Sequence, residues 1–267
     1  MNGSASEQAI AAATAYEDFF VPAMFREWAP RVADAARIEA GARVLDVACG
    51  TGVVAREAAR RVGPEGKVVG LDANPGMLAV AARLAPSLAW QQGDAHELPF
   101  ESGSFDVVVS QFGLMFFADR VRALREMLRV VAPGGRIAVC VWDALENAPA
   151  YALEVELLEQ YAGKAAADAL RAPFVLGDRQ EVERLFELAG AASITAKTVA
   201  GTGRFPSARA MLEADLRGWL PLVGIVIAEP QIEALLARAE EAFHPYVDAH
   251  GVLLCPAPAH IVSGTRH

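Results

Sequence analysis

The chain has 267 residues, of which 54% are hydrophobic and 21% charged, a balance that supports a packed core and excludes an intrinsically disordered protein. Its net charge of −9 and pI of about 5.1 argue against a nucleic-acid partner, because phosphate recognition needs a basic surface. Cys49, Cys140 and Cys255 lack the close spacing of a metal site or a redox pair. We therefore expect no metal and a reducing, cytoplasmic setting.

No segment is typical of a leader or a membrane span. Residues 9–15 are apolar, but no basic residue precedes them and Glu17 follows closely. The most apolar run, 219–228, has about half of the roughly 20 residues that a spanning helix needs, and Pro221 interrupts it. We expect this run to be buried or interfacial, and the chain to have no membrane span.

The hydrophobic pattern predicts an α/β architecture. Two helices, 9–20 and 22–36, come first, where they could fold over a cleft. From residue 43 to residue 143, short apolar strands alternate with amphipathic helices; the strands are 44–47, 67–72, 88–92, 105–110 and 136–142, and the helices include 76–84 and 120–131. Strands this apolar are buried on both faces, which indicates a parallel sheet covered by helices.

Beyond residue 143 the pattern is looser. It predicts helices at 150–170, 179–189, 207–216 and 230–243, and strands at 194–199 and 258–266.

The segment 44–52, Val-Leu-Asp-Val-Ala-Cys-Gly-Thr-Gly, is the most informative motif. A strand, a glycine loop and a helix in this order bind nucleotide-like cofactors in open α/β folds. Residues 50–55 also satisfy the dinucleotide pattern, so an NAD(P)-dependent oxidoreductase is a rival interpretation. However, Asp46 at the end of the strand would repel a pyrophosphate, whereas it suits a cationic cofactor.

Four blocks in order, 44–52, 69–77, 93–105 and 133–139, carry a family resemblance. With them the chain resembles the class I S-adenosylmethionine-dependent methyltransferases, in particular the small-molecule branch related to ubiquinone-biosynthesis enzymes (methyltransferase type 11). The similarity covers roughly residues 40–143 and is weaker in the N-terminal helices and in 110–117.

The resemblance implies a Rossmann-like fold, a seven-stranded mostly parallel sheet sandwiched by helices. The implied division is N-terminal helices over the cleft (1–42), a cofactor-binding core (43–143), and a helical cap insertion with the last two strands of the sheet (144–267). The implied activity is in-line transfer of a methyl group from S-adenosylmethionine to an oxygen, nitrogen or carbon of a small-molecule acceptor. A non-catalytic S-adenosylmethionine-binding protein is a further alternative, and an oligomer is possible.

The resemblance also assigns roles to residues. Asp46 would face the ammonium and sulfonium side of the cofactor, and Asp72 would accept hydrogen bonds from both ribose hydroxyls. Gly50 and Gly52 would let the backbone approach the methionine part. The other implied contacts are Ala48 in the loop, Ala73 and Met77 beside the adenine, Asp94 and Ala95 at its edge, and Ser110 and Gln111 at the methionine end. The family usually has glycine where this chain has Ala48, which is tolerated if its backbone angles are ordinary.

The acceptor side is less defined by the sequence. The candidates for the substrate pocket are Tyr16, Phe25, Trp28, Phe112 and Met115, although such side chains belong to a packed core more often than to a substrate wall. The run 219–227 is interpreted as a buried helix in preference to a hydrophobic lid over a lipophilic or aromatic acceptor, or a dimer contact.

No catalytic residue is assigned from the sequence. Possible bases are His96, His244, Tyr246 and His250, but no spacing links them to the pocket, and His96 is interpreted as a surface-loop histidine. Cys49 is interpreted as a small loop side chain, because transfer from a sulfonium needs no enzyme nucleophile.

Overall fold

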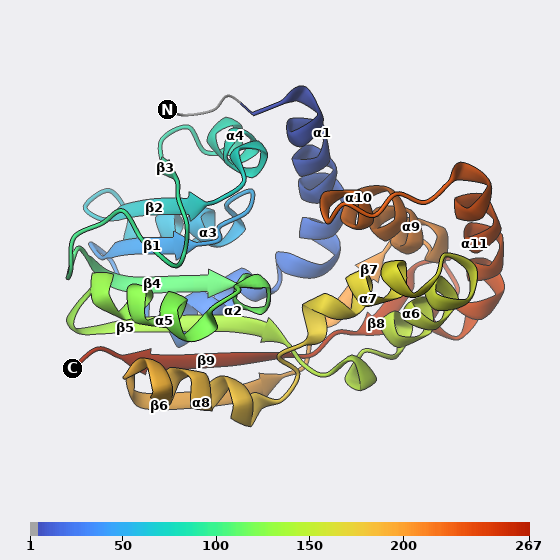
Figure 1. Ribbon diagram of the computed structural model, residues 1–267. Coiled ribbons are helices and arrows are strands. Elements are labelled where there is room, and N and C mark those ends of the chain that lie inside the picture. The colour runs from blue at the N-terminus through green and yellow to red at the C-terminus, as the bar shows by residue number, and fades with distance from the viewer. Residues whose placement is uncertain (1–4) are drawn as a thin grey trace.

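The computed structural model describes residues 5–267; residues 1–4 of the expected N-terminal segment lie outside the described part. One sheet of seven strands, in the order β3-β2-β1-β4-β5-β9-β6, forms the centre (Figure 1). Its strands are β1 Arg43–Val47, β2 Lys67–Asp72, β3 Ala89–Gln92, β4 Phe105–Gln111, β5 Val131–Trp142, β6 Ala192–Val199 and β9 Ala259–Thr265. β9 runs antiparallel to both of its neighbours, and the other pairings are parallel. The expected Rossmann-like, mostly parallel sheet is confirmed.

Helices cover both faces of this sheet. α2 (Trp28–Ala35) and α3 (Val53–Val62) pack on one face, and α5 (Arg120–Val130) and α8 (Arg179–Ala189) on the other (Figure 1). α4 (Pro75–Leu84) lies over β2 and β3. The central strands β1, β4 and β5 are buried between these layers, as their continuous apolar sequences indicate.

The N-terminal segment folds as three helical pieces where two were expected. α1 (Glu7–Ala15) continues into a π-helix, η1 (Tyr16–Phe25), and α2 follows after a short turn. Pro22 lies inside the π-helix, and its missing N–H removes one backbone donor from the helical ladder. The wider turn of a π-helix is typical of functional sites.

The cap lies beyond the carboxyl ends of the parallel strands (Figure 1). Its elements are α6 Pro149–Tyr161, α7 Lys164–Arg171, α9 Ala208–Glu213, the π-helix η5 Ala214–Trp219, α10 Leu220–Leu222, α11 Glu229–Ala242, and a small antiparallel sheet of β7 Thr202–Phe205 with β8 Leu253–Pro256. Short 3-10 turns are η2 Leu114–Phe116, η3 Leu145–Asn147, η4 Ala172–Phe174 and η6 His244–Tyr246.

Two expectations for the cap are corrected, and one element is additional. The helix expected over 150–170 is two helices, because Gly163 with φ +89° separates them. The β7–β8 sheet was not expected from the sequence. The run 219–227 is not a buried helix: α10 ends at Leu222, and the loop that follows exposes 86% of Val226.

No helix in the described residues has the length and apolar character needed to cross a membrane.

Candidate active site

A cleft opens at the carboxyl ends of β1, β2 and β4, where open α/β sheets bind their ligands. Asp46, near the end of β1, lies in its wall and is almost completely buried. Its Oδ2 accepts a hydrogen bond from the N–H of Ala55, in the first turn of α3, at 2.9 Å. Its Oδ1 has no hydrogen-bond partner in the described residues.

The charge state of Asp46 follows from this setting. Burial raises the pKa of Asp46 to about 8, and the Ala55 N–H opposes the rise while the nearby Asp72 carboxyl adds to it. A cation at Oδ1 would supply the missing partner and stabilise the charged carboxylate. The ammonium group of an amino acid would meet this requirement, whereas a phosphate would not.

Asp72 closes β2 beside Asp46. Its two oxygens accept hydrogen bonds from the backbone N–H groups of Gly50 and Asn74, each at 2.8 Å. Burial raises the pKa of Asp72, while these backbone donors pull it back toward the ionised form. Each carboxylate oxygen has a second lone pair. Asp72 can therefore fix the glycine loop and still accept hydrogen bonds from a ligand in the cleft.

The loop between β1 and α3 is wound in the left-handed region. Ala48, Gly50 and Gly52 have φ values of +55°, +55° and +86°. The condition that Ala48 keep ordinary backbone angles is therefore not met, and an L-residue is strained there by about 1–2 kcal/mol.

The two loop glycines lie differently. Gly50 lines the cleft. Gly52 lies behind its wall, where an added Cβ would come within 2.3 Å of the Trp90 ring.

Asp94 and His96 form a linked pair at the far end of the cleft. The Asp94 carboxylate accepts from the N–H of His96 at 2.9 Å and bonds its ring Nδ1 at 2.6 Å. His96 Nε2 accepts from the N–H of Asp119 at 3.1 Å, which fixes the ring hydrogen on Nδ1. These contacts lower the pKa of Asp94. His96 is therefore part of the cleft wall rather than a free surface side chain, and both of its ring nitrogens are engaged in hydrogen bonds.

The remaining residues expected around the cofactor fall in two groups. Ala48, Ala73, Met77, Ala95 and Gln111 line the cleft. Gln111 also donates from Nε2 to the carbonyl of Phe25 at 3.1 Å, which ties η1 to the end of β4. Ser110 is fully buried behind the wall, and its Oγ has no partner in the described residues.

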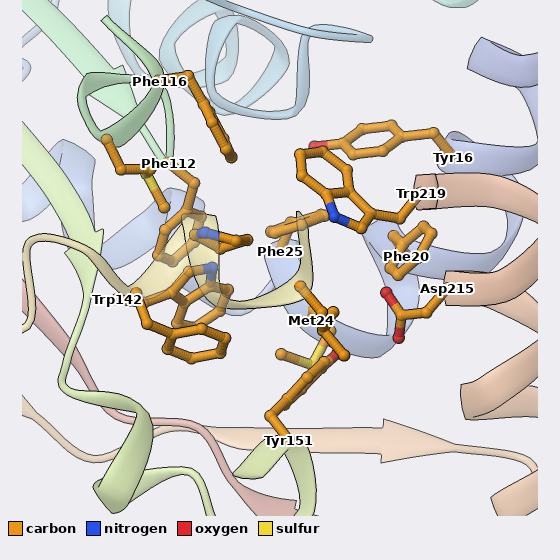
Figure 2. Close-up of a pocket in the computed structure, with 14 residues that line it drawn as sticks. Tyr16, Phe20, Met24, Phe25, Phe112, Phe116, Trp142, Tyr151, Asp215 and Trp219 are labelled. Atoms are coloured by element: carbon orange, nitrogen blue, oxygen red, sulfur yellow. The ribbon is translucent and has the colours of Figure 1, made fainter. Parts of the chain in front are cut away.

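A second, aromatic cavity adjoins the cleft (Figure 2). Tyr16, Phe25, Phe112 and Met115, four of the five expected pocket residues, line it. Trp28 does not: it is completely buried behind the wall, with its ring edge-on to Phe112 at 5.9 Å between centroids.

Both π-helices contribute to this cavity. Tyr16, Phe20 and Phe25 of η1 have the spacing of successive π-helical turns and all line it. Asp215 and Trp219 of η5 enter from the cap, and Trp142 stacks on Phe112 with ring centroids 3.8 Å apart.

Sequence reasoning missed several lining residues, namely Phe20, Met24, Trp142, Tyr151, Leu170, Pro173, Phe174, Asp215 and Trp219, whereas Phe116 lies in the segment 110–117 of weaker resemblance. Most come from segments whose spacing to the cofactor motifs is not fixed, so no local pattern could have found them. The apolar run starting at Trp219 was the one available signal.

The cleft and the aromatic cavity share four lining residues: Tyr16, Phe112, Phe116 and Trp219. The Phe116 and Trp219 rings lie 5.3 Å apart, and this pair links the core to the cap. A ligand in the cleft and a ligand in the aromatic cavity would therefore meet at these four side chains.

The other candidate bases lie away from both cavities. His244 and His250 are exposed, and Tyr246 is half-buried in the cap. The three cysteines are free and buried; Cys49 lines the cleft, and burial raises the pKa of its thiol, which disfavours the thiolate. In the described part of the chain, no cluster of three His, Cys, Asp or Glu residues is arranged to hold a metal ion.

This fold, with the Asp46 and Asp72 carboxyls at the ends of β1 and β2 and an unpartnered Asp46 oxygen in the cleft wall, is that of an α/β protein whose cleft suits a cationic, nucleoside-like cofactor. A model of a methyltransferase domain matches residues 44–135. The demethylmenaquinone methyltransferases of Staphylococcus carnosus (strain TM300) and Staphylococcus aureus (strain JH9) are each 34% identical over 188 residues, which covers 65% of this chain and 78% of theirs.

Solved structures show the same fold. The YcgJ protein from Bacillus subtilis has a TM-score of 0.57 at 19% identity, over 90% of this chain and 99% of that chain. Phosphoethanolamine N-methyltransferase 2 from Haemonchus contortus, in complex with S-adenosyl-L-methionine, has a TM-score of 0.60 at 18% identity, over 97% of this chain and 57% of that chain.

The chain belongs to the class I S-adenosylmethionine-dependent methyltransferases. Its cofactor is S-adenosylmethionine, and the rival interpretation as a nicotinamide oxidoreductase is not favoured.

Proposed function

We propose that this protein methylates a small molecule with a flat, apolar body, which binds in the aromatic cavity. The observation that carries the proposal is the set of four side chains shared by the cleft and the cavity, Tyr16, Phe112, Phe116 and Trp219. A methyl donor in the cleft and an acceptor in the cavity would be aligned across them. The relatives named for demethylmenaquinone are consistent with a lipophilic acceptor.

The proposed cofactor contacts use the cleft residues described above. Asp46 Oδ1 would accept from the ammonium of the methionine part, beside the backbone of Ala48 and Gly50 and the side chain of Gln111. Asp72 would hold the ribose hydroxyls, and Ala73, Met77, Asp94 and Ala95 would surround the adenine. Gly52 and Ser110 would support this site from behind, since neither lines the cleft.

When bound, S-adenosylmethionine supplies both the methyl group and its leaving group, so the protein needs no nucleophile of its own. The contribution of the chain is to orient the acceptor and exclude water, effects worth up to about 7–11 kcal/mol in well-aligned systems. Burial, together with the nearby Asp72 carboxyl, raises the pKa of Tyr16, so its hydroxyl stays protonated where the two cavities meet. No side chain is assigned as a catalytic base.

The proposed division of labour follows the sequence boundaries. Residues 43–143 bind the cofactor, while the described N-terminal helices and the cap segment of 144–267 select the acceptor. We further propose a cytoplasmic protein that does not bind nucleic acid, in keeping with its net charge of −9.

Calorimetry tests the cofactor assignment. We expect S-adenosylmethionine and S-adenosylhomocysteine to bind and NADH not to bind. Binding of NADH alone would overturn the proposal.

The acceptor assignment is tested with a panel of aromatic hydroxyl compounds, aromatic amines and demethylmenaquinol analogues, scored by S-adenosylhomocysteine formation. Phe25→Leu changes a residue that lines the aromatic cavity and not the cleft. It should raise the KM for the acceptor about tenfold, because the lost ring contact is worth about 1.4 kcal/mol. The affinity for the cofactor should not change. An unchanged KM would place the acceptor elsewhere.

A further inference from the structure

Two acidic side chains meet at the edge of the aromatic cavity. Asp215 belongs to η5 and Glu154 to α6, and both are almost completely buried. Oδ2 of Asp215 and both carboxyl oxygens of Glu154 have no N–H or O–H donor from the described residues. Each carboxyl instead has the other as its neighbour, and they share a hydrogen bond when one is protonated.

The two acids have different access to the cavity. Asp215 is one of its lining residues, and Glu154 is not. Figure 2 shows the Asp215 carboxyl pointing into the space bordered by Phe20, Met24 and Tyr151. Asp215 is therefore the group that a ligand would touch, and Glu154 stands behind it.

No positive charge of the protein balances this pair. The cavity wall contains no lysine, arginine or histidine, and no ion pair within residues 5–267 includes Asp215 or Glu154. Leaving a buried carboxylate without a counter-charge costs several kcal/mol, so such a group either takes up a proton or binds a cation. Burial raises the pKa of both carboxyls, so in the unliganded protein the pair takes up a proton.

The walls around Asp215 suit the second outcome. Phe20, Tyr151 and Trp219 line the same cavity as Asp215, and aromatic faces attract ammonium groups most strongly when water is excluded. An aromatic cage closed by one carboxylate is the arrangement that recognises organic ammonium ions. A neutral hydroxyl could hydrogen-bond the protonated pair, but it would not supply the counter-charge that allows Asp215 to ionise.

We propose that the aromatic cavity recognises its acceptor through a cationic amine placed against Asp215, with the apolar body of the acceptor between the rings of η1 and η5. This inference rests on the proposed function, since it assumes that the acceptor occupies this cavity. It concerns recognition and leaves open which atom receives the methyl group.

The test compares three probes of similar size, the 2-phenylethylammonium ion, 2-phenylethanol and 3-phenylpropionate. Their binding to the full chain saturated with S-adenosylhomocysteine is measured by calorimetry. We expect the ammonium ion to bind at least tenfold more tightly than the alcohol and the carboxylate to show no binding. Equal or tighter binding of the alcohol, or no binding of the ammonium ion, would overturn the inference.

Three variants locate the effect. Asp215→Asn should reduce the affinity for the ammonium ion at least tenfold and leave the affinity for the alcohol unchanged. Glu154→Gln keeps a neutral partner behind Asp215 and should change the ammonium affinity less than threefold. Glu156→Gln, an exposed acid on the same helix, is the matched control and should have no effect. An ammonium affinity that survives Asp215→Asn in a folded protein would contradict the inference.

The result separates the two proposals. If S-adenosylhomocysteine binds and the ammonium preference is absent, the recognition of an amine is wrong and the methyltransferase assignment stands. If S-adenosylhomocysteine itself does not bind, the proposed cofactor site is wrong.

Discussion

In the cofactor cleft, Asp46 and Asp72 sit at strand ends and accept hydrogen bonds from backbone N–H groups close in sequence, at 2.8–2.9 Å. At the aromatic cavity, Asp215 in the wall and Glu154 behind it come from segments about sixty residues apart and have no backbone donor. The cleft thus holds its charges with the local geometry of strand, loop and helix. The cavity depends on side chains that meet through the folding of the cap.

The first prediction tests whether close packing against Trp90 constrains the glycine loop of the cleft. In Gly52→Ala the new Cβ would meet the Trp90 ring at 2.3 Å in a residue with φ +86°. Trp90 is held in place by its hydrogen bond to the Ala85 carbonyl at 3.0 Å. We expect a loss of about 3 kcal/mol in the free energy of unfolding, measured with urea, from overpacking and backbone strain together.

Gly190→Ala is the control for that loss. Gly190 is left-handed like Gly52, with φ +92° and ψ +23°, but nothing lies within 4 Å of the added Cβ. It should lose only the backbone cost of about 1–2 kcal/mol. Equal losses in the two variants would show that contact with Trp90 does not constrain the loop.

The second prediction tests whether Asp72, in the cofactor cleft, holds the ribose of the cofactor. Asp72→Ala should weaken S-adenosylhomocysteine binding by about 1.5–3 kcal/mol, the usual value of hydrogen bonds to a charged group. Asp106→Ala is the control, because Asp106 lies at the start of β4 and pairs with Arg43 away from the cleft. If calorimetry gives Asp72→Ala the wild-type affinity, the ribose is held by other residues.

The third prediction concerns the charge of the cavity. Burial raises the pKa of Asp215 to about 8, far above its ordinary value of 3.8. Because the folded state binds this proton more tightly than the unfolded state, its contribution to the free energy of unfolding is present below pH 4. That contribution is lost as the pH rises toward 8. Asp215→Asn has no such loss, so at pH 8 it should be more stable than the wild type by at least about 1 kcal/mol, or roughly 2–4 °C in Tm.

At pH 3 the two melting temperatures should nearly coincide, because the wild-type carboxyl is then mostly protonated in both the folded and the unfolded state. Glu156→Gln should follow the wild type at both pH values. A variant that is less stable than the wild type at pH 8 would mean that the Asp215 carboxylate has a compensating partner.

The smallest expected effect on cofactor affinity comes from the loop after α10, at the border between the cleft and the cap. Val223 lines the cleft, whereas Val226 in the same loop is 86% exposed and lines neither cavity. Val223→Ala should weaken S-adenosylhomocysteine binding about twofold, since part of an apolar side chain, worth about 0.5 kcal/mol, is lost from the wall. Val226→Ala should bind like the wild type. Identical affinities for the two variants would rule out a lid role for this loop.

The sequence by itself determined the core. The alternation of apolar strands and amphipathic helices predicted the parallel sheet, and Asp46, Gly50 and Asp72 could be placed in the cleft because each lies at or just beyond the carboxyl end of a strand. Such positions depend on contacts within about thirty residues. The sequence did not predict the backbone of the loop, because Ala48 takes a left-handed conformation that an alanine side chain does not favour.

The tertiary structure decided the rest. Trp28 and Phe25 lie close together in sequence and look alike as candidates, yet one packs behind the wall and the other lines the cavity. Asp215 acquires its neighbours, Glu154 and the aromatic rings, when the cap folds against η1. The physical reason is that burial and charge compensation at such a site depend on distant segments, whose separation in space no local pattern encodes.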